Sequence, residues 1–392
     1  MTSDLHKPGA ALAAGTSADP WATPPADPDG ETYYLNMGPQ HPSMHGVLRL
    51  LLELRGEEIV KCEPIIGYAH RAHEKMAENR NYMMFLPNTS RVDYLSGMIY
   101  NIAYCQAVEK MLAIEVPERA EHIRVIVCEL NRVSSHLLWF GTFLLDLGGI
   151  TPFLYSFDDR EQILSILDRV TGSRLTYCYG RFGGVTEDVD KKFLDETTAF
   201  LARLRGRMAE YHALVTDNVI FRSRCEGVGV IDRETAIEYG VTGPTLRAAG
   251  VPYDVRRAEP YGIYDRFEFD IPTASGADNL ARYYVRVAEM EQSMRIIEQA
   301  IAKIPDGPIM PEKALKRFKP DVGEHYFAVE SARGQFGIYI VSDGSDVPFR
   351  IKLRTPSFSN LACMPDVLRG TMVADTIAIL GSIDIVLPEV DR

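Results

Sequence analysis

Cysteine is scarce in this sequence, and the cysteines that are present stand far apart. The 392 residues contain six of them, at Cys62, Cys105, Cys128, Cys178, Cys225 and Cys363. No two form a CxxC pair, the spacing with which a single chain usually holds zinc or an iron–sulfur cluster. We therefore expect no clustered cysteine ligation by this chain alone, and reduced thiols of the kind found in a cytoplasm.

Long hydrophobic runs and an excess of positive charge are also missing. The most apolar stretch, Leu137 to Leu145, ends at Asp146 and falls well short of the roughly 18 residues that span a bilayer. The net charge of -12 argues against non-specific binding of nucleic acid and against a basic surface that faces a membrane. Any association with a membrane is therefore expected to come through partner proteins.

The composition is that of a globular protein with an unusual start. Residues 1–30 lack the basic start and apolar centre of a secretory signal, and their Ala, Pro, Asp and Thr content predicts a disordered tail. The chain is 46% hydrophobic and 24% charged, and its length suggests two or three structural units. We expect an α+β fold with an N-terminal β-sheet unit over 31–90, a helical bundle over 91–310 and a small C-terminal α+β unit over 311–392.

Hydrophobic periodicity predicts the elements of these units. Alternating patterns indicate antiparallel strands at residues 32–37, 47–54 and 58–65. Helical spacing indicates helices over residues 91–116, from 117 to about 144, and over 160–170, 189–214 and 283–301. After a linker over 304–323, further strands are predicted within 324–344 and 348–358, and a last helix over 366–380. The segment 241–273, rich in Gly, Pro, Tyr and Arg, is expected to be an ordered loop and a candidate subunit interface.

The loop between the first two predicted strands is the first candidate site. It reads GPQHPSMHG, from Gly38 to Gly46, and carries His41 and His45. Binding and catalytic groups gather on loops held by a rigid scaffold, and histidine can donate a proton, carry charge or bind a metal near neutral pH. The alternative is a tight turn whose histidines bond only the backbone.

A second polar cluster follows the third predicted strand, where His70, Arg71 and His73 lie close together. With the histidines of the loop they raise the question of a zinc site, but the spacings match no common zinc pattern and no cysteine is near. Arg71 keeps its charge at any relevant pH and would favour a nearby anion or reduced cluster. The alternative for Arg71 is a surface salt bridge with Glu74 or Glu78.

One carboxylate stands at the end of the second predicted helix. The buried stripe of that helix runs from Ile123 to Leu144, and Asp146 falls off the stripe, in register with Trp139 on another face. A carboxylate at the end of so apolar a helix is either solvated or paired. If it is paired, a histidine is a natural partner.

Ten motifs, taken in order, resemble those of the D subunits of NADH-quinone oxidoreductases, the respiratory complex I family. They are GPQHPSMHGVLRL, GYAHRAHEK, RVDYLSG, ELNRVSSHL, LLDLG, TPFLYSF, TGSR, RFGGV, ESARG and the terminal DxxxxExDR. Together they cover the chain from about Glu31 to Arg392, and their order makes the match far more specific than any single motif. The resemblance implies a subunit of a proton-pumping NADH:quinone oxidoreductase.

That family is similar to the large subunit of nickel–iron hydrogenases, which holds its metals with two CxxC pairs. The resemblance places Asp93 and Ser96 at the cysteine positions of the first pair, and Val386 and Glu389 at those of the second. Without four soft thiolates a nickel–iron centre is not held, so hydrogenase chemistry is excluded. The implied fold is that of the hydrogenase large subunit, a bundle of long helices with the two smaller units described above.

The resemblance implies that the former metal cavity is a quinone headgroup site, shared with the neighbouring iron–sulfur subunit of the complex. The quinone-binding pair falls on His45 and Tyr94, the carboxylate that pairs with the histidine on Asp146, and the arginine beside the partner's [4Fe-4S] cluster on Arg71. Tyrosine and histidine can each donate a hydrogen bond and a proton to a quinone oxygen, which stabilises the negative charge that develops on reduction. By itself, Tyr94 would be interpreted as a core tyrosine at the start of a helix.

The chain departs from the family at Thr176, where most relatives carry a histidine close to the partner's cluster. We hypothesise that the potential of the cluster is therefore lower and less dependent on pH, as would suit a low-potential quinone such as menaquinone. A smaller departure is Ala72, where relatives usually have glycine.

The resemblance also implies partners and a location. The partners are complex I subunits B, C, I and H, of which the first holds the [4Fe-4S] cluster and the last is the quinone-channel membrane protein. This chain would be peripheral, on the cytoplasmic side of a bacterial plasma membrane. It holds no cofactor alone: electrons arrive from the partner's cluster, and NAD(H) is used elsewhere in the complex. Two alternatives stay open, a non-catalytic scaffold that positions the iron–sulfur subunit and a subunit of a hydrogenase-like or ferredoxin-dependent membrane complex.

Overall fold

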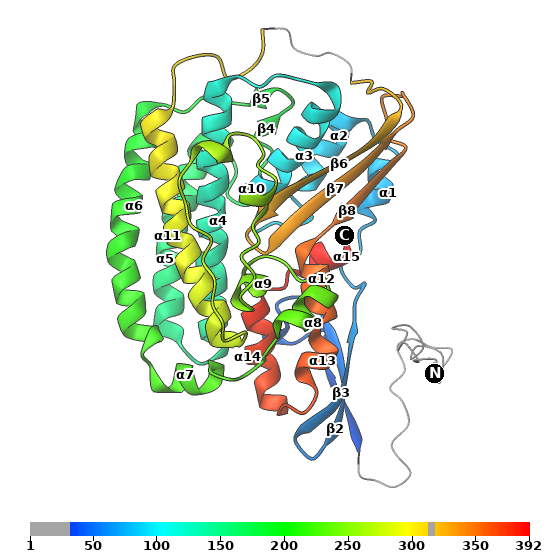
Figure 1. The fold of residues 1–392 in the computed structure, drawn as a ribbon, viewed down its shortest axis with the longest axis vertical. Helices are drawn as coiled ribbons and strands as arrows, with labels where there is room; N and C mark the ends of the chain where they lie inside the picture. Colours follow the sequence, from blue (N-terminus) through cyan, green and yellow to red (C-terminus); the bar gives the residue numbers. More distant parts are fainter. Residues whose placement is uncertain (1–31, 313–317) are drawn as a thin grey trace, which may run out of the picture.

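The computed structural model describes residues 32–312 and 318–392. Long helices run side by side along one flank of the molecule and form its largest layer (Figure 1). They are α4 (Glu118–Asp146), α5 (Ile150–Thr171), α6 (Lys191–Tyr211) and α11 (Asn279–Lys303). A π-helical turn, η3 (His212–Thr216), continues α6 and leads to α7 (Val219–Cys225). The tail predicted over residues 1–30 and part of the predicted linker lie outside the described residues.

Apolar stripes at helical spacing hold this bundle together. The stripe predicted on α4 is at most 4% exposed at every position: Ile123, Ile126, Leu130, Val133, Leu137, Phe140 and Leu144. The stripe on α11 packs in the same core through Tyr283, Val287, Met290, Met294 and Ile297. Burying one large apolar side chain stabilises a fold by about 1.5–3 kcal/mol, so each stripe is a large part of the driving force. The helices predicted from 117 and over 283–301 are confirmed.

Two antiparallel sheets lie away from the outer helices of the bundle, and the C-terminal helices stand between the first sheet and the bundle (Figure 1). The first pairs β1 (Tyr33–Met37), β2 (Arg49–Arg55) and β3 (Glu58–Ile65), and the second pairs β6 (Gly323–Ser331), β7 (Gly334–Ser342) and β8 (Arg350–Arg354). Both confirm strands predicted from alternating residues. The turn between β6 and β7 is only Ala332 and Arg333, since Ser331 pairs with Gly334. A short pair, β4 (Gly180–Arg181) and β5 (Gly184–Val185), follows α5.

The two ends of the chain build one hydrophobic core. The C-terminal helices are α12 (Pro356–Ala362), α13 (Met364–Leu368), α14 (Val373–Ile383) and α15 (Leu387–Asp391). Their buried side chains form one cluster with those of the first sheet, for example Ile383 and Met364 with Leu50 and Ile59. This packing brings the histidine loop next to the C-terminal motif. The division of the chain into three units stays a prediction.

The helix predicted to begin at residue 91 was placed too early, because α3 spans Gly97–Leu112. Oδ1 of Asp93 accepts hydrogen bonds from the backbone N–H groups of Leu95 and Ser96, at 3.0 and 3.2 Å. An aspartate that bonds the backbone two and three residues ahead holds a turn in place of a helix. The residues of RVDYLSG therefore form a turn in front of α3.

Two other helix boundaries differ from the prediction. The helix predicted from residue 160 begins at Ile150, where Gly148 and Gly149 end α4 and Pro152 fits into the first turn. The helix predicted over 366–380 is split into α13 and α14. Between them the N–H of Gly370 donates to the carbonyl of Ile59 at 2.8 Å, so the chain leaves the helix to pair with β3.

Short elements escaped the prediction because one or two turns hold too few apolar positions to show a period. They include η2 (Pro42–Met44), α1 (His73–Ala77), α2 (Tyr82–Thr89), α8 (Arg233–Glu238), α9 (Pro244–Ala248), α10 (Val255–Ala258) and η4 (Tyr264–Arg266). The last three lie in the segment 241–273. That segment also buries Arg247, Asp254 and Arg256 to 2% exposure or less, so part of it belongs to the interior.

Candidate functional site

The histidine loop is fixed at both of its ends. Gly38 has a φ of +89°, and a Cβ there would lie 2.0 Å from the carbonyl oxygen of Leu48, so only glycine fits without moving β2. Within the loop, Met44 of η2 is fully buried in the core that the first sheet shares with the C-terminal helices. The loop is therefore a rigid support for its histidines.

The two histidines of this loop have different partners. His41 Nδ1 accepts a hydrogen bond from the backbone N–H of Ser43 at 3.3 Å, which is what a simple turn requires. His45 Nε2 instead lies 2.6 Å from Oδ2 of Asp146, the last residue of α4. The two side chains are 20% and 11% exposed, so the contact is partly shielded from water. An imidazole–carboxylate contact of this length is strong when the ring is protonated.

The His45–Asp146 pair packs against the end of α14. A Cβ on Gly381 would lie 3.4 Å from Asp146 Oδ2 and 3.6 Å from His45 Nε2. Trp139 Nε1 donates a hydrogen bond to the carbonyl of Gly381 at 2.8 Å and fixes α14 against α4. A larger side chain at position 381 would therefore press directly on the pair.

Tyr94 lies in the turn before α3, beside a buried ion pair. Arg333, at the tip of the β6–β7 hairpin, donates to Asp93 at 2.9 Å and to Ser96 Oγ at 3.2 Å, and it pairs with Asp384 at 3.3 Å. Burial raises the pKa of the half-buried Tyr94 above its usual value, and the negative charge of Asp93 raises it further. Tyr94 therefore keeps its proton at neutral pH.

Asp384 connects the two halves of the site because it follows α14 directly, three residues after Gly381. It adopts the left-handed conformation, with φ 63° and ψ 59°, which costs a non-glycine residue on the order of 1–3 kcal/mol. Its Oδ2 is buried and has no hydrogen-bond partner among the described residues. The surrounding structure holds Asp384 in this unfavourable conformation. Its Oδ2 is available to accept a hydrogen bond from a further group.

Glu389 of α15 is a third carboxyl group in this region, and it is fully buried. It accepts hydrogen bonds from the hydroxyl groups of Tyr100 on α3 and Ser357 on α12. Burial, and after it the negative charge of Asp93, raise the pKa of Glu389 from 4.5 to about 7. The group can therefore gain and lose a proton near neutral pH.

Arg71 lies outside this cluster, on an exposed segment in front of α1. Its guanidinium donates a hydrogen bond to the carbonyl oxygen of Arg91, in the turn that carries Tyr94. The salt bridges considered for Arg71 are not formed, because Glu74 and Glu78 both pair with Arg350, at 2.9 and 2.7 Å.

Thr176 lies in the turn that follows α5. Its carbonyl accepts a hydrogen bond from Ser173 Oγ at 3.3 Å. The carbonyl oxygen of its neighbour Leu175 would lie 3.3 Å from a Cβ on Gly97, so this turn packs against the start of α3. Arg71 and the turn of Thr176 therefore both contact the segment 91–97, which carries Tyr94.

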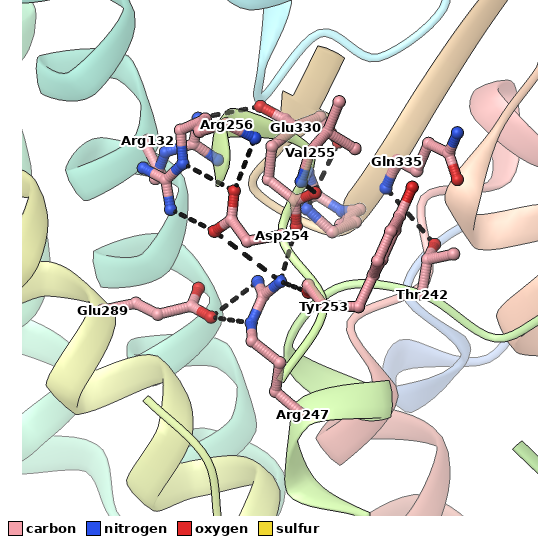
Figure 2. Close-up of polar contacts among 12 residues, drawn as sticks. Arg132, Thr242, Arg247, Tyr253, Asp254, Val255, Arg256, Glu289, Glu330 and Gln335 are labelled. Atoms are coloured by element: carbon pink, nitrogen blue, oxygen red, sulfur yellow. Dashed lines mark hydrogen bonds and ion pairs between the residues drawn. The ribbon is translucent and has the colours of Figure 1, made fainter. Parts of the chain in front are cut away.

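A second buried network holds the hairpin that carries Arg333 (Figure 2). Glu330 lies three residues earlier in the chain and accepts hydrogen bonds from Arg247 at 2.8 Å and from the N–H of Val255 at 3.1 Å. Arg247 also donates to Glu289 of α11 at 2.6 Å. These contacts tie the hairpin to α9, α10 and the bundle, so they set the position of its tip.

Sequence reasoning missed several groups of this region. Arg333 and Asp384 lie inside the motifs ESARG and DxxxxExDR, so motif membership was a signal that could have found them. The resemblance assigns to Glu389 only the position of a hydrogenase cysteine. Tyr100 lies in an apolar helical pattern, and nothing in the sequence marks its contact with a carboxyl group 289 residues away.

The arrangement gathers hydrogen-bonding and ionisable side chains that are buried or half-buried. Within residues 32–312 and 318–392, no three His, Cys, Asp or Glu side chains gather where they could hold a metal ion. In the same ranges, no helix has the length and apolarity needed to cross a membrane. The groups gathered here are hydrogen-bonding and ionisable ones: the His45–Asp146 contact, the protonated Tyr94 and the buried guanidinium of Arg333.

Comparison with known proteins gives a consistent result. Residues 146–320 and 312–392 match the family model described as respiratory-chain NADH dehydrogenase, 49 Kd subunit. A protein of Syntrophobacter fumaroxidans, named as the D subunit of NADH-quinone oxidoreductase, is 60% identical over 362 residues, which are 92% of this chain and 97% of the relative. Proteins with the same name from Desulfotalea psychrophila and Geobacillus thermodenitrificans are 55% and 52% identical, over 93% and 92% of this chain and 98% and 99% of their own lengths.

Proposed function

Because the chain belongs to the family of the 49-kDa subunit of respiratory-chain NADH dehydrogenase, we propose that it forms the quinone headgroup site of that enzyme. The chain is one subunit of a multisubunit NADH:quinone oxidoreductase. Its part in that reaction is to bind the quinone and to supply protons as electrons arrive from a partner.

The observation that carries this proposal is the contact between His45 and Asp146 at 2.6 Å, beside the end of α14. The same end of α14 carries Asp384, which joins Arg333, Asp93 and the turn of Tyr94. The His45–Asp146 pair and the turn that carries the protonated Tyr94 are thus both linked to the end of α14. A molecule with two acceptor oxygens suits this arrangement.

Reduction of a quinone to a quinol takes up two electrons and two protons. Tyr94 donates a hydrogen bond, and then its proton, to one quinone oxygen, and His45 does the same for the other oxygen. Asp146 holds the imidazole in the donating orientation through the 2.6 Å contact. Donors aimed at both oxygens stabilise the negative charge as it develops.

We also propose that the quinone site occupies the place of the metal centre in the hydrogenase large subunit. Asp93 and Ser96 take the positions of two metal-binding cysteines in that comparison, and both contact the guanidinium of Arg333, at 2.9 and 3.2 Å. These two positions therefore hold oxygen groups bound to a cation, and they offer no soft thiolate ligands to nickel or iron. The former metal cavity would then be a polar cavity for an organic substrate.

Electrons reach the quinone from the [4Fe-4S] cluster of the neighbouring iron–sulfur subunit, and NAD(H) is used elsewhere in the complex. Arg71 and Thr176 would lie near that cluster; Arg71 contacts Arg91, and Leu175, the neighbour of Thr176, packs against Gly97. The further partners are subunits C, I and H, the last of them in the membrane. The chain would be peripheral, on the cytoplasmic side of the membrane, in a complex that pumps protons.

The test is the turnover of the assembled complex with Tyr94→Phe and His45→Ala. We expect reduction of a short-chain quinone by NADH to fall by about 10²-fold or more in each variant, because each loses a proton donor. Reduction of an artificial acceptor by NADH is expected to stay unchanged, since it does not need the quinone site.

Two matched controls belong to this test. His41→Ala changes a histidine of the same loop that bonds only the backbone, and Tyr339→Phe removes a hydroxyl group that bonds Glu324 in the second sheet. Both control variants should keep quinone turnover.

Full quinone activity in the Tyr94 and His45 variants would contradict the proposed site. It would favour a scaffold that only positions its partner, in this complex or in a ferredoxin-dependent relative.

A further inference from the structure

The end of α14 and the residue after it touch both halves of the candidate site. A Cβ on Gly381 would lie 3.4 Å from Asp146 Oδ2 and 3.6 Å from His45 Nε2, so the backbone of α14 lies directly against that pair. Three residues later, Asp384 pairs with Arg333 at 3.3 Å, and the same guanidinium bonds the turn before α3 at 2.9 Å. The position of this one segment therefore bears on the surroundings of both proposed proton donors.

The segment 381–384, which we call the α14 turn, is held by side chains of two neighbouring helices. A helix leaves the carbonyl groups of its last turn without partners inside the helix. Trp139 Nε1 of α4 donates to the carbonyl of Gly381 at 2.8 Å. Arg286 of α11 donates to the carbonyls of the next two residues, at 2.8 and 3.0 Å. Three consecutive carbonyls of the α14 turn thus have side-chain donors from outside the helix.

Trp139 and Arg286 also contact each other. The guanidinium of Arg286 lies over the ring of Trp139, 4.5 Å from the ring centroid, where a cation is attracted to the face of an indole. Trp139 is 1% exposed and Arg286 is fully buried. The two side chains, which we call the Trp139–Arg286 clamp, therefore form one buried unit that fastens the α14 turn to α4 and α11.

Arg286 is an unusual group to find in such a place. In the part of the chain that the structure describes, its guanidinium bonds only backbone carbonyls, although a buried charge is costly without an ion pair. Burial lowers its pKa to about 10, against the opposing charge of Asp384, so the group stays charged at neutral pH. An apolar side chain would serve packing alone. What the planar guanidinium adds is a fixed position for two adjacent carbonyls.

We propose that the Trp139–Arg286 clamp positions the two proton donors of the proposed quinone site, His45 and Tyr94, relative to each other. This inference rests on the proposed quinone site. The clamp fixes the α14 turn, whose first residue lies against His45 and its carboxylate partner. The last residue of the α14 turn pairs with Arg333, which holds the turn of Tyr94. Both donors must reach one substrate molecule, so a shift of the α14 turn by about 1 Å would lower turnover by up to about 10²-fold.

The test is a double-mutant cycle on quinone turnover by the assembled complex, built on Trp139→Phe. Phenylalanine keeps an aromatic ring beside Arg286 but has no N–H to donate to the carbonyl of Gly381. We expect Trp139→Phe to lower quinone reduction by NADH about tenfold in the native chain. In His45→Ala the same change should lower it by only about twofold or less, because the donor that it positions is absent. A purely structural role would lower turnover by the same factor in both backgrounds.

Arg286→Lys tests the other half of the clamp. Lysine keeps the positive charge, but its single ammonium group does not reproduce the two-pronged contact with adjacent carbonyls. Quinone turnover should fall by about threefold or more in the native chain, and most of that effect should be lost in Tyr94→Phe.

Tyr104→Phe is the matched control for both variants. It removes another buried side-chain donor to a backbone carbonyl, the 3.2 Å bond from Tyr104 to Tyr82, between α3 and α2. Because this bond does not hold the α14 turn, Tyr104→Phe should keep quinone turnover. Reduction of an artificial acceptor by NADH should stay unchanged in all of these variants.

The clamp and the quinone site can fail separately. The clamp is overturned, and the site stands, if Trp139→Phe keeps as much turnover as Tyr104→Phe while His45→Ala loses it. Equal effects of Trp139→Phe with and without His45, or of Arg286→Lys with and without the Tyr94 hydroxyl, would overturn it as well. If His45→Ala and Tyr94→Phe both keep full turnover, the quinone site itself is refuted, and the clamp has no donors to position.

Discussion

Arg247→Met provides a strong test of the buried network that holds the β6–β7 hairpin. The guanidinium is 1% exposed and bonds Glu289 at 2.6 Å and Glu330 at 2.8 Å. Methionine fills a similar volume but leaves two carboxyl groups without their cation in the interior. Breaking a buried ion pair in this way costs about 3–5 kcal/mol, which is a large share of the roughly 5–15 kcal/mol that hold a typical domain folded.

Arg205→Met is the matched control, because Arg205 bonds carboxylates with the same chemistry at the surface. It is 40% exposed and pairs with Glu298 and Glu291, which are 41% and 47% exposed. Solvent screens such pairs, so the expected cost is below about 1 kcal/mol. The two variants therefore separate the effect of burial from the effect of losing an arginine.

The assay is unfolding of the purified chain in urea, followed by tryptophan fluorescence. The midpoint should move strongly in Arg247→Met and little in Arg205→Met, with the slope unchanged in both. In the assembled complex, Arg247→Met should also lower quinone turnover, because Glu330 no longer fixes the hairpin that carries Arg333. Equal costs for the two variants, or less than about 1 kcal/mol for Arg247→Met, would refute this account.

Two further predictions concern other parts of the site. Thr176→His should raise the midpoint potential of the partner's cluster and make it depend on pH, because a nearby imidazole takes up a proton more readily when the cluster is reduced. A redox titration of the complex at several pH values that finds an unchanged potential would contradict this. Gly38→Ala should lower quinone turnover, because its Cβ would meet Leu48 at 2.0 Å, whereas Gly56→Ala, with a similar positive φ but open space around it, should not. Similar turnover in these two variants would argue against a rigid histidine loop.

Much of the fold could be predicted from the sequence where the pattern is long. β3 spans the residues predicted for it, 58–65, and α4 and α11 follow their apolar stripes. Apolar residues that recur at helical spacing over many turns lie on one face only if the segment is a helix, so the local pattern is enough to predict the helix. The turn of Tyr94 and the break between α13 and α14 could not be predicted in this way. Asp93 holds the turn before α3, and pairing with β3 ends α13, in stretches where the apolar pattern reads as continuous helix.

The residues of the candidate site could also be predicted only in part from the sequence. The motifs pointed to His45, Tyr94, Asp146, Arg71 and Thr176, and their roles stay proposals until the variants are measured. A partner for Asp146 could be expected from the sequence, since a carboxylate at the end of an apolar helix is costly to leave unpaired. No such expectation was possible for the contacts of Arg333, because they join three separate segments of the chain: the turn of Asp93 and Ser96, the β6–β7 hairpin and Asp384.

The sequence by itself determined the long helices and strands, the absence of thiolate pairs and the presence of titratable groups in ordered motifs. The tertiary structure alone decided which of those groups meet. His45 and Asp146 are 101 residues apart, and Arg333 and Asp93 are 240 apart. Contacts over such separations, and the burial that raises the pKa of Glu389, depend on how both ends of the chain pack into one core. Local periodicity carries no information about that packing, because it records only which face of each element is apolar.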